Sequence, residues 1–388
     1  MIPALAITEP VSATPQPIRG RCLTEIGGER NASGLAEPMV ASASRIFAPR
    51  GACIHPQDGS LWISDTGHHR VLGWRNPLGN NAASQVIGHP DFQGDGRNAG
   101  DAVCASSMNV PTGLCAYGSG LAVADAWNHR VLIWRNLPTE TGQPADIVLG
   151  QEDFNSDTPN RGQTAPDAGG MHWPFGLLVH DGHLYVADTG NRRVLIWETL
   201  PEHSGQPADR VIGQVDFMRR DENGGAAVSS ASMRWPHALA IWQGRLCVAD
   251  AGNNRIMVYA TELPATGSGC QYVLGQADKG GSAHMRGRMA TAADALNMPY
   301  GLASSGDWLI ATDTASSRLL AWYVDALCDG AAANGLCGQL SFSQQGDNAW
   351  GEVTTNSLCW PYAVAVHERW LITCDTGNSR VLLHELAL

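Results

Sequence analysis

The stretch LYVADTGNRRVLIW, Leu184–Trp197, has the pattern of two β-strands joined by a tight turn. Its ends are rich in β-branched, aromatic and other apolar residues, while Asp, Gly and Asn lie between them, as expected for a hairpin. Five relatives of this stretch occur elsewhere in the chain. A repeated hairpin indicates a repeat architecture, so the number of repeats, rather than the chain length, decides how many domains to expect.

A proline precedes each hairpin and sets the period of the repeat. Consecutive prolines are 62 or 63 residues apart, at Pro49, Pro111, Pro174, Pro236, Pro299 and Pro361. A strand of small and apolar residues such as PFGLLVH follows the proline, and a fourth strand begins elements such as VLGQEDF, which starts at Val148. Four antiparallel strands per unit, repeated radially, predict an all-β fold, a six-bladed β-propeller.

The two ends of the chain predict how the ring closes. The sixth repeat ends at RVLLHELAL without a fourth strand, and the unpaired element EIGGERN, residues 25–31, resembles the missing strand. We therefore expect the N-terminal strand to complete the C-terminal blade, so that loss of either end opens the whole ring. We expect residues 1–20 to form a flexible arm and residues 21–388 to form a single propeller.

Composition narrows the class of protein and its partners. The chain is 44% apolar and 16% charged, which is typical of a globular protein with a large core. Its net charge of -12 repels phosphate backbones, which argues against nucleic acid as a partner, and RNA recognition would need a basic rim. No apolar run approaches the roughly 18 residues of a membrane span. Ten cysteines without CxxC pairs, and a start without a secretory pattern, favour a cytoplasmic protein; export would require a different start.

The repeat pattern P-x-G-[LV]-A, followed by [LI]-x-V-A-D-[TA]-x-N-x-R-[VI], resembles the NHL repeat. The additional V-L-G-Q-x-D-F element is similar to that of bacterial NHL-repeat proteins, and the resemblance covers nearly the whole chain after residue 20. It implies a propeller. Because such propellers include protein-binding modules, RNA-binding modules and lyases, the resemblance does not choose an activity.

Residues that recur in every repeat are interpreted as parts of the scaffold. Each turn has an Asp at its head and an Arg five positions later, from Asp65 and Arg70 to Asp375 and Arg380. We expect the carboxylate to accept N–H groups of the turn and the guanidinium to bond carboxylates or carbonyls between blades. An aromatic series four residues after the arginine, expected to pack between sheets, contains Trp74, Trp134, Trp197, Tyr259 and Trp322, with His384 as a sixth member at the surface or the ring closure.

The residue just before the repeat arginine indicates whether the zinc site of one class of enzyme could be present. Zinc-dependent amidating lyases of peptide hormones are similar in fold and take histidine ligands from this turn. Here the position holds His69, His129, Arg192, Asn254, Ser317 and Ser379. Since only two of the six are histidines, we do not transfer the zinc site to this chain.

Two positions beside the proline differ from repeat to repeat and are expected at the mouth of the central channel, under long inter-blade loops. Two residues before the proline lie Phe47, Asn109, His172, Arg234, Asn297 and Cys359; one residue after it lie Arg50, Thr112, Phe175, His237, Tyr300 and Tyr362. We predict a ligand site formed by Arg50, Asn109, His172, Arg234, His237, Asn297, Tyr300, Cys359 and Tyr362, suited to an anion, a polar organic ligand or a metal. The alternative is that these side chains only bond loop backbones and water.

Three of these residues could form a metal site. Histidine and cysteine are ligands that zinc and other transition metals favour, so His172, His237 and Cys359 are the candidate trio, with Cys359 reaching across the channel. Three other histidines, His55, His180 and His367, follow their prolines by six residues and are expected on the opposite face.

No G-x-S-x-G, P-loop or H-E-x-x-H motif is present, and no carboxylate pair stands out as acid and base. The sequence therefore favours a non-enzymatic binding or scaffold propeller that recognises a partner protein or a small ligand at the loop-rich channel mouth. The alternative is a metal-dependent lyase or hydrolase, or a metal- or metallocofactor-binding protein, with its site at the central channel.

Overall fold

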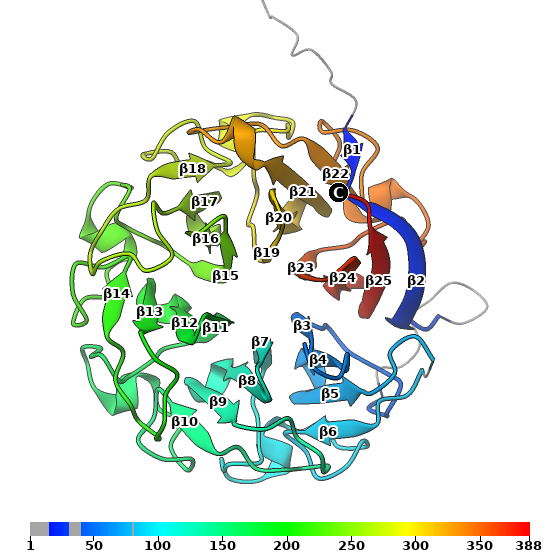
Figure 1. Cartoon of the computed structure of the whole chain (residues 1–388), viewed down its shortest axis with the longest axis vertical. Helices are drawn as coiled ribbons and strands as arrows, with labels where there is room; N and C mark the ends of the chain where they lie inside the picture. The colour runs from blue at the N-terminus through cyan, green and yellow to red at the C-terminus, as the bar shows by residue number, and fades with distance from the viewer. Residues whose placement is uncertain (1–14, 31–39, 80) are drawn as a thin grey trace, which may run out of the picture.

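The computed structural model describes residues 15–30, 40–79 and 81–388. It shows six four-stranded blades around one axis, which confirms the predicted six-bladed propeller (Figure 1). Neighbouring strands within each of these blades are antiparallel. The innermost strand of each blade begins at the proline or within a few residues after it, so the repeat period of the sequence becomes the blade spacing of the ring.

The strands of the blades follow the predicted order. Blade 1 contains β3 (Gly51–Ile54), β4 (Leu61–Asp65), β5 (Arg70–Trp74) and β6 (Gln85–Ile87). Blade 2 contains β7 (Pro111–Tyr117), β8 (Gly120–Asp125), β9 (Arg130–Trp134) and β10 (Ile147–Leu149). Blade 3 contains β11 (Pro174–His180), β12 (His183–Asp188), β13 (Arg193–Trp197) and β14 (Arg210–Ile212).

The other three blades repeat this plan. Blade 4 contains β15 (Pro236–Trp242), β16 (Arg245–Asp250), β17 (Arg255–Val258) and β18 (Tyr272–Leu274). Blade 5 contains β19 (Leu302–Ser305), β20 (Trp308–Asp313), β21 (Arg318–Tyr323) and β22 (Gly335–Cys337). Blade 6 contains β23 (Pro361–His367), β24 (Trp370–Asp375), β25 (Arg380–Leu386) and the N-terminal β2 (Arg19–Gly27).

Short 3-10 turns connect these strands. In the hairpins between second and third strands they are η1 (Thr66–His68), η3 (Ala126–Asn128), η5 (Thr189–Asn191), η7 (Ala251–Asn253), η9 (Thr314–Ser316) and η12 (Thr376–Asn378). In the inter-blade loops they are η2 (Arg97–Gly100), η4 (Pro159–Gly162), η6 (Glu222–Gly225), η8 (His284–Gly287) and η11 (Asp347–Trp350), and η10 (Val324–Ala326) follows β21. Within the part of the chain that the structure describes, no helix has the length and apolar character needed to cross a bilayer.

Strand β2 closes the ring, as the sequence predicts. It pairs antiparallel with β25, with Glu25 opposite Leu382 and Ile26 opposite Val381. A short strand β1 (Gln16–Pro17) adds in parallel to β22 of blade 5, so the N-terminal segment contacts two blades. Strand residues thus begin ahead of the boundary expected at residue 21. The rest of the expected arm, residues 1–14, and the last residue of EIGGERN lie outside the described residues.

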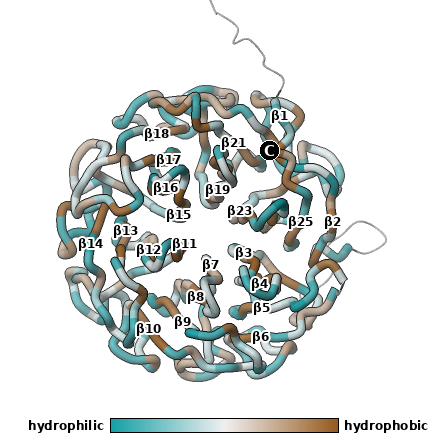
Figure 2. The backbone as a smooth tube through the Cα atoms, viewed as in Figure 1, coloured by the Kyte–Doolittle hydropathy of each residue, from teal (hydrophilic) through white to brown (hydrophobic). Residues whose placement is uncertain are grey.

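The core consists of six separate clusters, one at each junction between neighbouring blades. Hydrophobic residues are accordingly spread around the whole ring in Figure 2, with no single hydrophobic centre. The expected aromatic series is buried between the sheets, with Trp134 and Trp197 completely inaccessible. His384, the sixth member, is also fully buried in the closing blade, where its Nε2 lies 3.0 Å from the Thr355 carbonyl oxygen.

The repeated Asp–Arg pairs are buried scaffold ion pairs in all six blades. Their Nε–Oδ2 distances are between 2.7 and 3.0 Å. Each Arg also bonds the inter-blade loops; Arg130, for example, donates to the carbonyl oxygens of Phe154, Cys104 and Ser107. One detail of the expectation is corrected. The Asp Oδ1 accepts the N–H of the residue two before the proline, as Asp188 does from His172 at 2.7 Å, rather than capping its own turn.

The position before the repeat arginine links one blade to the next. All six residues there have left-handed backbone conformations, with φ between 51° and 57°. In five junctions the side chain accepts the backbone N–H that precedes the next proline, for example His69 from Val110 at 3.1 Å and Asn254 from Met298 at 2.9 Å. The exception is Arg192, which has no acceptor atom. Trp235 N–H bonds Asp250 instead, at 3.3 Å, so the sixfold pattern breaks between blades 3 and 4.

Candidate functional site at the propeller axis

The six side chains that follow the repeat prolines meet at the axis and line one cavity of about 430 Å³. They are Arg50, Thr112, Phe175, His237, Tyr300 and Tyr362. The rings form a chain of contacts: centroid distances are 4.3 Å for Phe175–His237, 4.3 Å for His237–Tyr300 and 4.7 Å for Tyr300–Tyr362. The guanidinium of Arg50 lies 4.9 Å from the Tyr362 centroid. The gap between the inner strands in Figure 1 is therefore filled by side chains, which form the floor of the cavity.

The walls of the cavity come from blades 2, 3 and 4. Inter-blade loops and hairpin turns contribute Val110, Ala126, Trp127, His172, Trp173, Thr189, Gly190, Arg192 and Trp235. Three of these wall residues are tryptophans that are unusually exposed: Trp127 is 52%, Trp173 46% and Trp235 37% exposed. The cavity is thus asymmetric within a nearly symmetric ring, as a site for one ligand requires.

His237 presents a hydrogen-bond acceptor at the floor. Its Nδ1 lies 2.9 Å from the Trp235 carbonyl oxygen, an acceptor, so Nδ1 carries the proton. Burial lowers the pKa of His237 to about 4, with the Arg50 charge acting in the same direction. The ring is therefore neutral at pH 7, and the lone pair is on Nε2, which has no hydrogen bond from any described residue.

His172 lies above the floor, beside a second histidine. Its ring centroid is 5.2 Å from that of His129, edge to face, and 6.4 Å from that of Trp173. Burial lowers the pKa of His172, and the charges of Arg220 and Arg192 add to the effect while Asp188 opposes it. Burial also lowers the pKa of His129 to about 4, and its Nδ1 accepts the Trp173 N–H at 3.1 Å. Both rings are uncharged at neutral pH.

The cavity has positive charge and unused donors. The described residues that line it include Arg50 and Arg192 but no Asp or Glu. Three buried nitrogen atoms on this lining, Arg50 Nε, Arg192 Nε and His172 Nδ1, have no hydrogen-bond partner among the described residues. An unsatisfied buried polar atom costs about 1–3 kcal/mol, and the described part of the chain supplies no partner for these three nitrogen atoms of Arg50, Arg192 and His172.

Five of the nine residues proposed from the sequence lie together in this cavity. They are Arg50, His172, His237, Tyr300 and Tyr362. The other four are not part of its lining. Asn109, Asn297 and Cys359 are anchored through their backbone N–H to the Asp of their own blade, and Arg234 pairs with Glu222 at 2.9 Å and lies over Trp235.

The sequence did not lead us to place the three tryptophans or Arg192 in the site, although the sequence position of Trp127 and Trp173 is unusual. Trp127 occupies a turn position where the other repeats have Gly or Ala, and Trp173 occupies the position before the proline, which is Ala48 in the first repeat. Trp173 also has φ 59°, a left-handed conformation that a bulky side chain rarely adopts. The same position is also left-handed in four other repeats, at Ala48, Val110, Met298 and Trp360, so this conformation belongs to the repeat.

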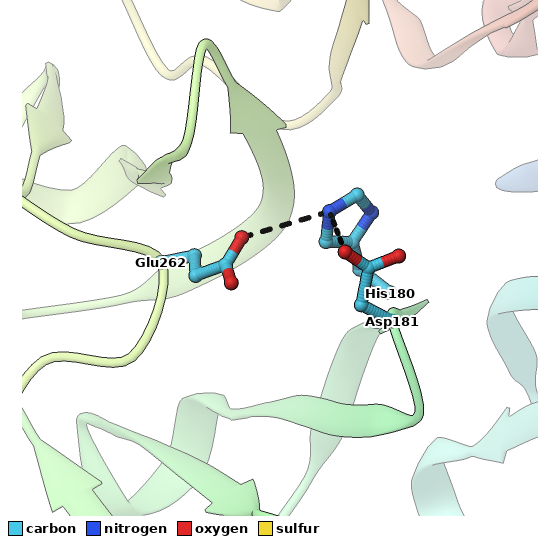
Figure 3. A group of neighbouring side chains, drawn as sticks. All are labelled: His180, Asp181 and Glu262. Atoms are coloured by element: carbon cyan, nitrogen blue, oxygen red, sulfur yellow. Dashed lines mark ion pairs between the residues drawn. The ribbon is translucent and has the colours of Figure 1, made fainter.

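The proposed metal trio is not gathered in space. The donor atoms of His172, His237 and Cys359 are not all within 4.8 Å of one another, and burial raises the pKa of Cys359 to about 12. The one group of three potential ligands found among the described residues is His180, Asp181 and Glu262, at the exit of β11 (Figure 3). There His180 Nε2 lies 3.6 Å from Asp181 and 3.7 Å from Glu262, in an exposed cluster of ion pairs outside the axial cavity.

Two solved structures are similar to this chain at low sequence identity. A solved structure of the computationally designed Ika8 protein shares 9% identity and a TM-score of 0.40, over 90% of this chain and 74% of that chain. The β-propeller domain of Myceliophteria thermophila Cps50 (Swd1) shares 10% identity and a TM-score of 0.47, over 90% of this chain and 99% of that domain. No curated protein matches the sequence.

A family match falls on the blade that completes the cavity wall. Residues 233–259 match the NHL repeat and span β15, β16 and β17 of blade 4. Each of the other five blades has the same Asp–Arg pair and the same hairpin. The match and the six-bladed ring together support an NHL-repeat propeller family for this chain.

Proposed function

We propose that this chain is a non-enzymatic binding propeller that recognises a small ligand in the axial cavity at the loop-rich face. The observation that carries the proposal is the coincidence, in one asymmetric cavity, of half-exposed tryptophans with the side chains of Arg50 and Arg192 and no carboxylate among the described lining residues. Cavities of a few hundred Å³ with apolar walls and a few polar groups are typical of small-molecule sites. A partner protein, the other occupant considered, would have to insert a side chain or chain end, because the floor is closed.

A variant that fills the cavity tests the proposal. Thr112→Phe places at the floor the residue that Phe175 provides in the next blade, so the backbone accommodates it. In a thermal-shift screen of small molecules, we expect compounds that stabilise the parent protein and have no effect on Thr112→Phe. Asn254→Ser is the matched control, because Ser is found at this position in blades 5 and 6 and Asn254 is not in the cavity lining. Hits that stabilise parent and Thr112→Phe equally would contradict an axial site.

Elemental analysis of protein purified without an affinity tag tests the metal-dependent alternative. A stoichiometric transition metal that is lost in His172→Ala would favour a metal-dependent lyase, hydrolase or metallocofactor carrier over the binding proposal. A metal content unrelated to His172 would favour the binding proposal. A third test, retention of nucleic acid at low salt, addresses RNA recognition, which the net charge of -12 disfavours.

A further inference from the structure

The sign of the charge in the axial cavity opposes that of the protein as a whole. The chain carries a net charge of -12, yet the described lining contains two guanidinium groups and no carboxylate. The histidines of the lining do not add or remove charge at neutral pH, because they are uncharged there. A cation would therefore meet repulsion from Arg50 and Arg192, whereas an anion would find charge-assisted donors in a partly desolvated setting.

Neither of these two guanidinium groups is fully paired within the described part of the protein. Arg50 Nε and Arg192 Nε are buried and have no hydrogen-bond partner among the described residues. Arg192 is held in place by its Nη1 bonds to the carbonyl oxygens of Gly190 and Arg220, at 2.8 and 3.2 Å. The other five blades have a His, Asn or Ser at this position. Its side chain accepts the backbone N–H that links the blade to the next, as Ser379 does from Ala48. Blade 3 thus lacks a structural bond that every other junction has, and it places a cation in the cavity instead.

The rest of the lining favours flat rings. Trp127 and Trp173 have ring centroids 6.3 Å apart at an angle of 44°, and they rise from blades 2 and 3 over the aromatic floor. Aromatic side chains stack on flat conjugated ligands through offset or edge-to-face contacts. The exposed area of these tryptophans is also costly in water, so a ligand that covers it gains the free energy of burying apolar surface.

The threonine hydroxyls of the lining are not free donors for a ligand. The two threonine hydroxyls that line the cavity already donate to the protein, Thr112 to the Phe175 carbonyl oxygen at 2.7 Å and Thr189 to the Pro236 carbonyl oxygen. The closed floor also prevents a polymer from passing through the ring, since Phe175 and Tyr362 lie 6.5 Å apart across the axis. A compact molecule with one flat ring system and one anionic group suits the volume, the charge and the donors.

We propose that the ligand of the axial cavity is a flat aromatic or heteroaromatic anion, whose ring stacks among Trp127, Trp173 and the floor and whose anionic group bonds Arg50 or Arg192. This inference rests on the proposed function, since it specifies the ligand class of the same site. It predicts selectivity for ring and charge together, which neither an aromatic cage for cations nor a purely apolar cavity would show.

The test uses four probes on the full chain, measured by isothermal titration calorimetry. Naphthoate carries ring and anion, naphthamide the ring alone, naphthylmethylammonium the ring and a cation, and cyclohexanecarboxylate the anion without the aromatic ring. One charge-assisted hydrogen bond corresponds to roughly tenfold or more in affinity. We expect naphthoate to bind at least about tenfold more tightly than each of the other three probes.

Substitutions borrowed from other blades assign this preference to residues. Arg192→Asn copies Asn254 of blade 4, and Arg50→Thr copies Thr112 of blade 2, so both are expected to fold. Each is expected to reduce naphthoate affinity by about tenfold and leave naphthamide affinity unchanged. Asn254→Ser, outside the cavity lining, should change neither.

The outcomes separate this inference from the proposed function. If naphthamide or naphthylmethylammonium binds as tightly as naphthoate, and Thr112→Phe abolishes that binding, the anion inference is wrong and the axial binding site stands. If naphthoate is preferred but both arginine variants keep the preference, the residue assignment is overturned. If no probe binds the parent protein, the aromatic-anion class is wrong, and the thermal-shift screen with Thr112→Phe then decides whether the cavity binds anything else.

Discussion

Phe175 of blade 3 and Tyr362 of blade 6 belong to opposite sides of the propeller, yet their ring centroids lie 6.5 Å apart across the axis. Tyr300 of blade 5 lies 6.2 Å from the same Phe175 ring. These contacts close the channel at the level of the inner strands. The cavity lies beside these rings, and its walls come from inter-blade loops and hairpin turns that carry the tryptophans and Arg192.

Replacing Trp173 with glycine should separate stability from binding. Trp173 holds φ 59°, and removing a side chain from the left-handed region relieves on the order of 1 kcal/mol of strain. Its N–H bond to His129 is kept in glycine. We expect the free energy of unfolding to stay level or rise slightly, as measured by urea denaturation, while the affinity for an aromatic probe falls at least about tenfold because the stacking surface is lost.

Trp360→Gly is the matched control for that substitution. Trp360 occupies the equivalent position in blade 6, with φ 46° and 52% exposure, but it is not in the cavity lining. It should show the same effect on stability and none on binding. Equal loss of binding in both variants would mean that the effect comes from the backbone and not from the cavity.

The bond between Glu25 and Arg380 should contribute to closing the ring. Glu25 Oε1 accepts from Arg380 Nη1 at 3.0 Å, and Arg380 is almost fully buried. In the other five blades a loop carbonyl oxygen occupies this place, such as that of Phe154 for Arg130. Glu25→Ala leaves a donor of a buried guanidinium unpaired, so we expect about 2 kcal/mol lower unfolding free energy in urea denaturation.

Glu385→Ala provides the comparison on the partner strand. Its ion pair with Arg21 is also 3.0 Å long, but both side chains are substantially exposed, so the expected loss is about 0–0.5 kcal/mol. Similar losses in both variants would contradict the role assigned to Glu25.

Deletion of residues 1–27, which removes β2, should abolish cooperative unfolding of the ring rather than only lower the free energy of unfolding slightly.

The repeated arginines should matter for folding far more than for binding. Arg318 donates to Asp313 at 2.7 Å and to the loop carbonyl oxygens of Phe342 and Ala292, and it is fully buried. Arg318→Ala leaves a buried carboxylate uncompensated, which costs about 3–5 kcal/mol. Arg219→Ala, which removes an exposed pair with Asp216, should cost less than about 0.5 kcal/mol. A mild effect of Arg318→Ala on the thermal midpoint would contradict the scaffold interpretation.

Stability should fall on mild acidification. Burial lowers the pKa of His129, His237 and His384 to about 4 in the folded chain, whereas an unfolded histidine titrates near 6.5. Between pH 6.5 and 4 the unfolded state thus binds more protons, so the unfolding free energy decreases as pH falls. The expected slope is on the order of 1 kcal/mol per pH unit for each histidine.

His384→Trp isolates one of these contributions. Four other repeats have Trp at this position, with the indole N–H donating to a loop carbonyl oxygen, as in Trp197 to Gln206 at 3.1 Å. Urea denaturation at pH 7 and pH 5.5 should show less pH dependence of the unfolding free energy in this variant than in the parent. An unchanged slope would place the acid sensitivity elsewhere.

The fold could be predicted from the sequence because the same residues mark the same strands and turns in every repeat. Six prolines at a constant spacing and six Asp–Arg pairs define the blades, and the unpaired strand at Glu25 identifies the closure. The site was predicted only in part, for a physical reason. Residues one position after the proline lie at or just before the start of the inner strand in all six blades, so Arg50, His237 and their equivalents line the same cavity at the axis. Side chains two before the proline, such as Asn297, follow a loop whose path depends on contacts that periodicity does not encode.

Arg192 illustrates what symmetry alone conceals. A charged residue in a tight turn usually faces solvent, and only the structure shows that Arg192 lines a cavity at a junction that lacks the acceptor used at the other five. The same holds for the three tryptophans, because an aromatic residue in a propeller sequence is expected to pack between sheets, as Trp134 does.

A crystal structure of the protein soaked with naphthoate tests most directly the central claim that an aromatic anion binds in the axial cavity. We predict the ring in the axial cavity, in contact with Trp173 and the aromatic floor, with the carboxylate within hydrogen-bond distance of Arg50 or Arg192. Naphthoate bound outside the ring of residues that follow the prolines, with the axial cavity holding only water at saturating ligand, would contradict the account.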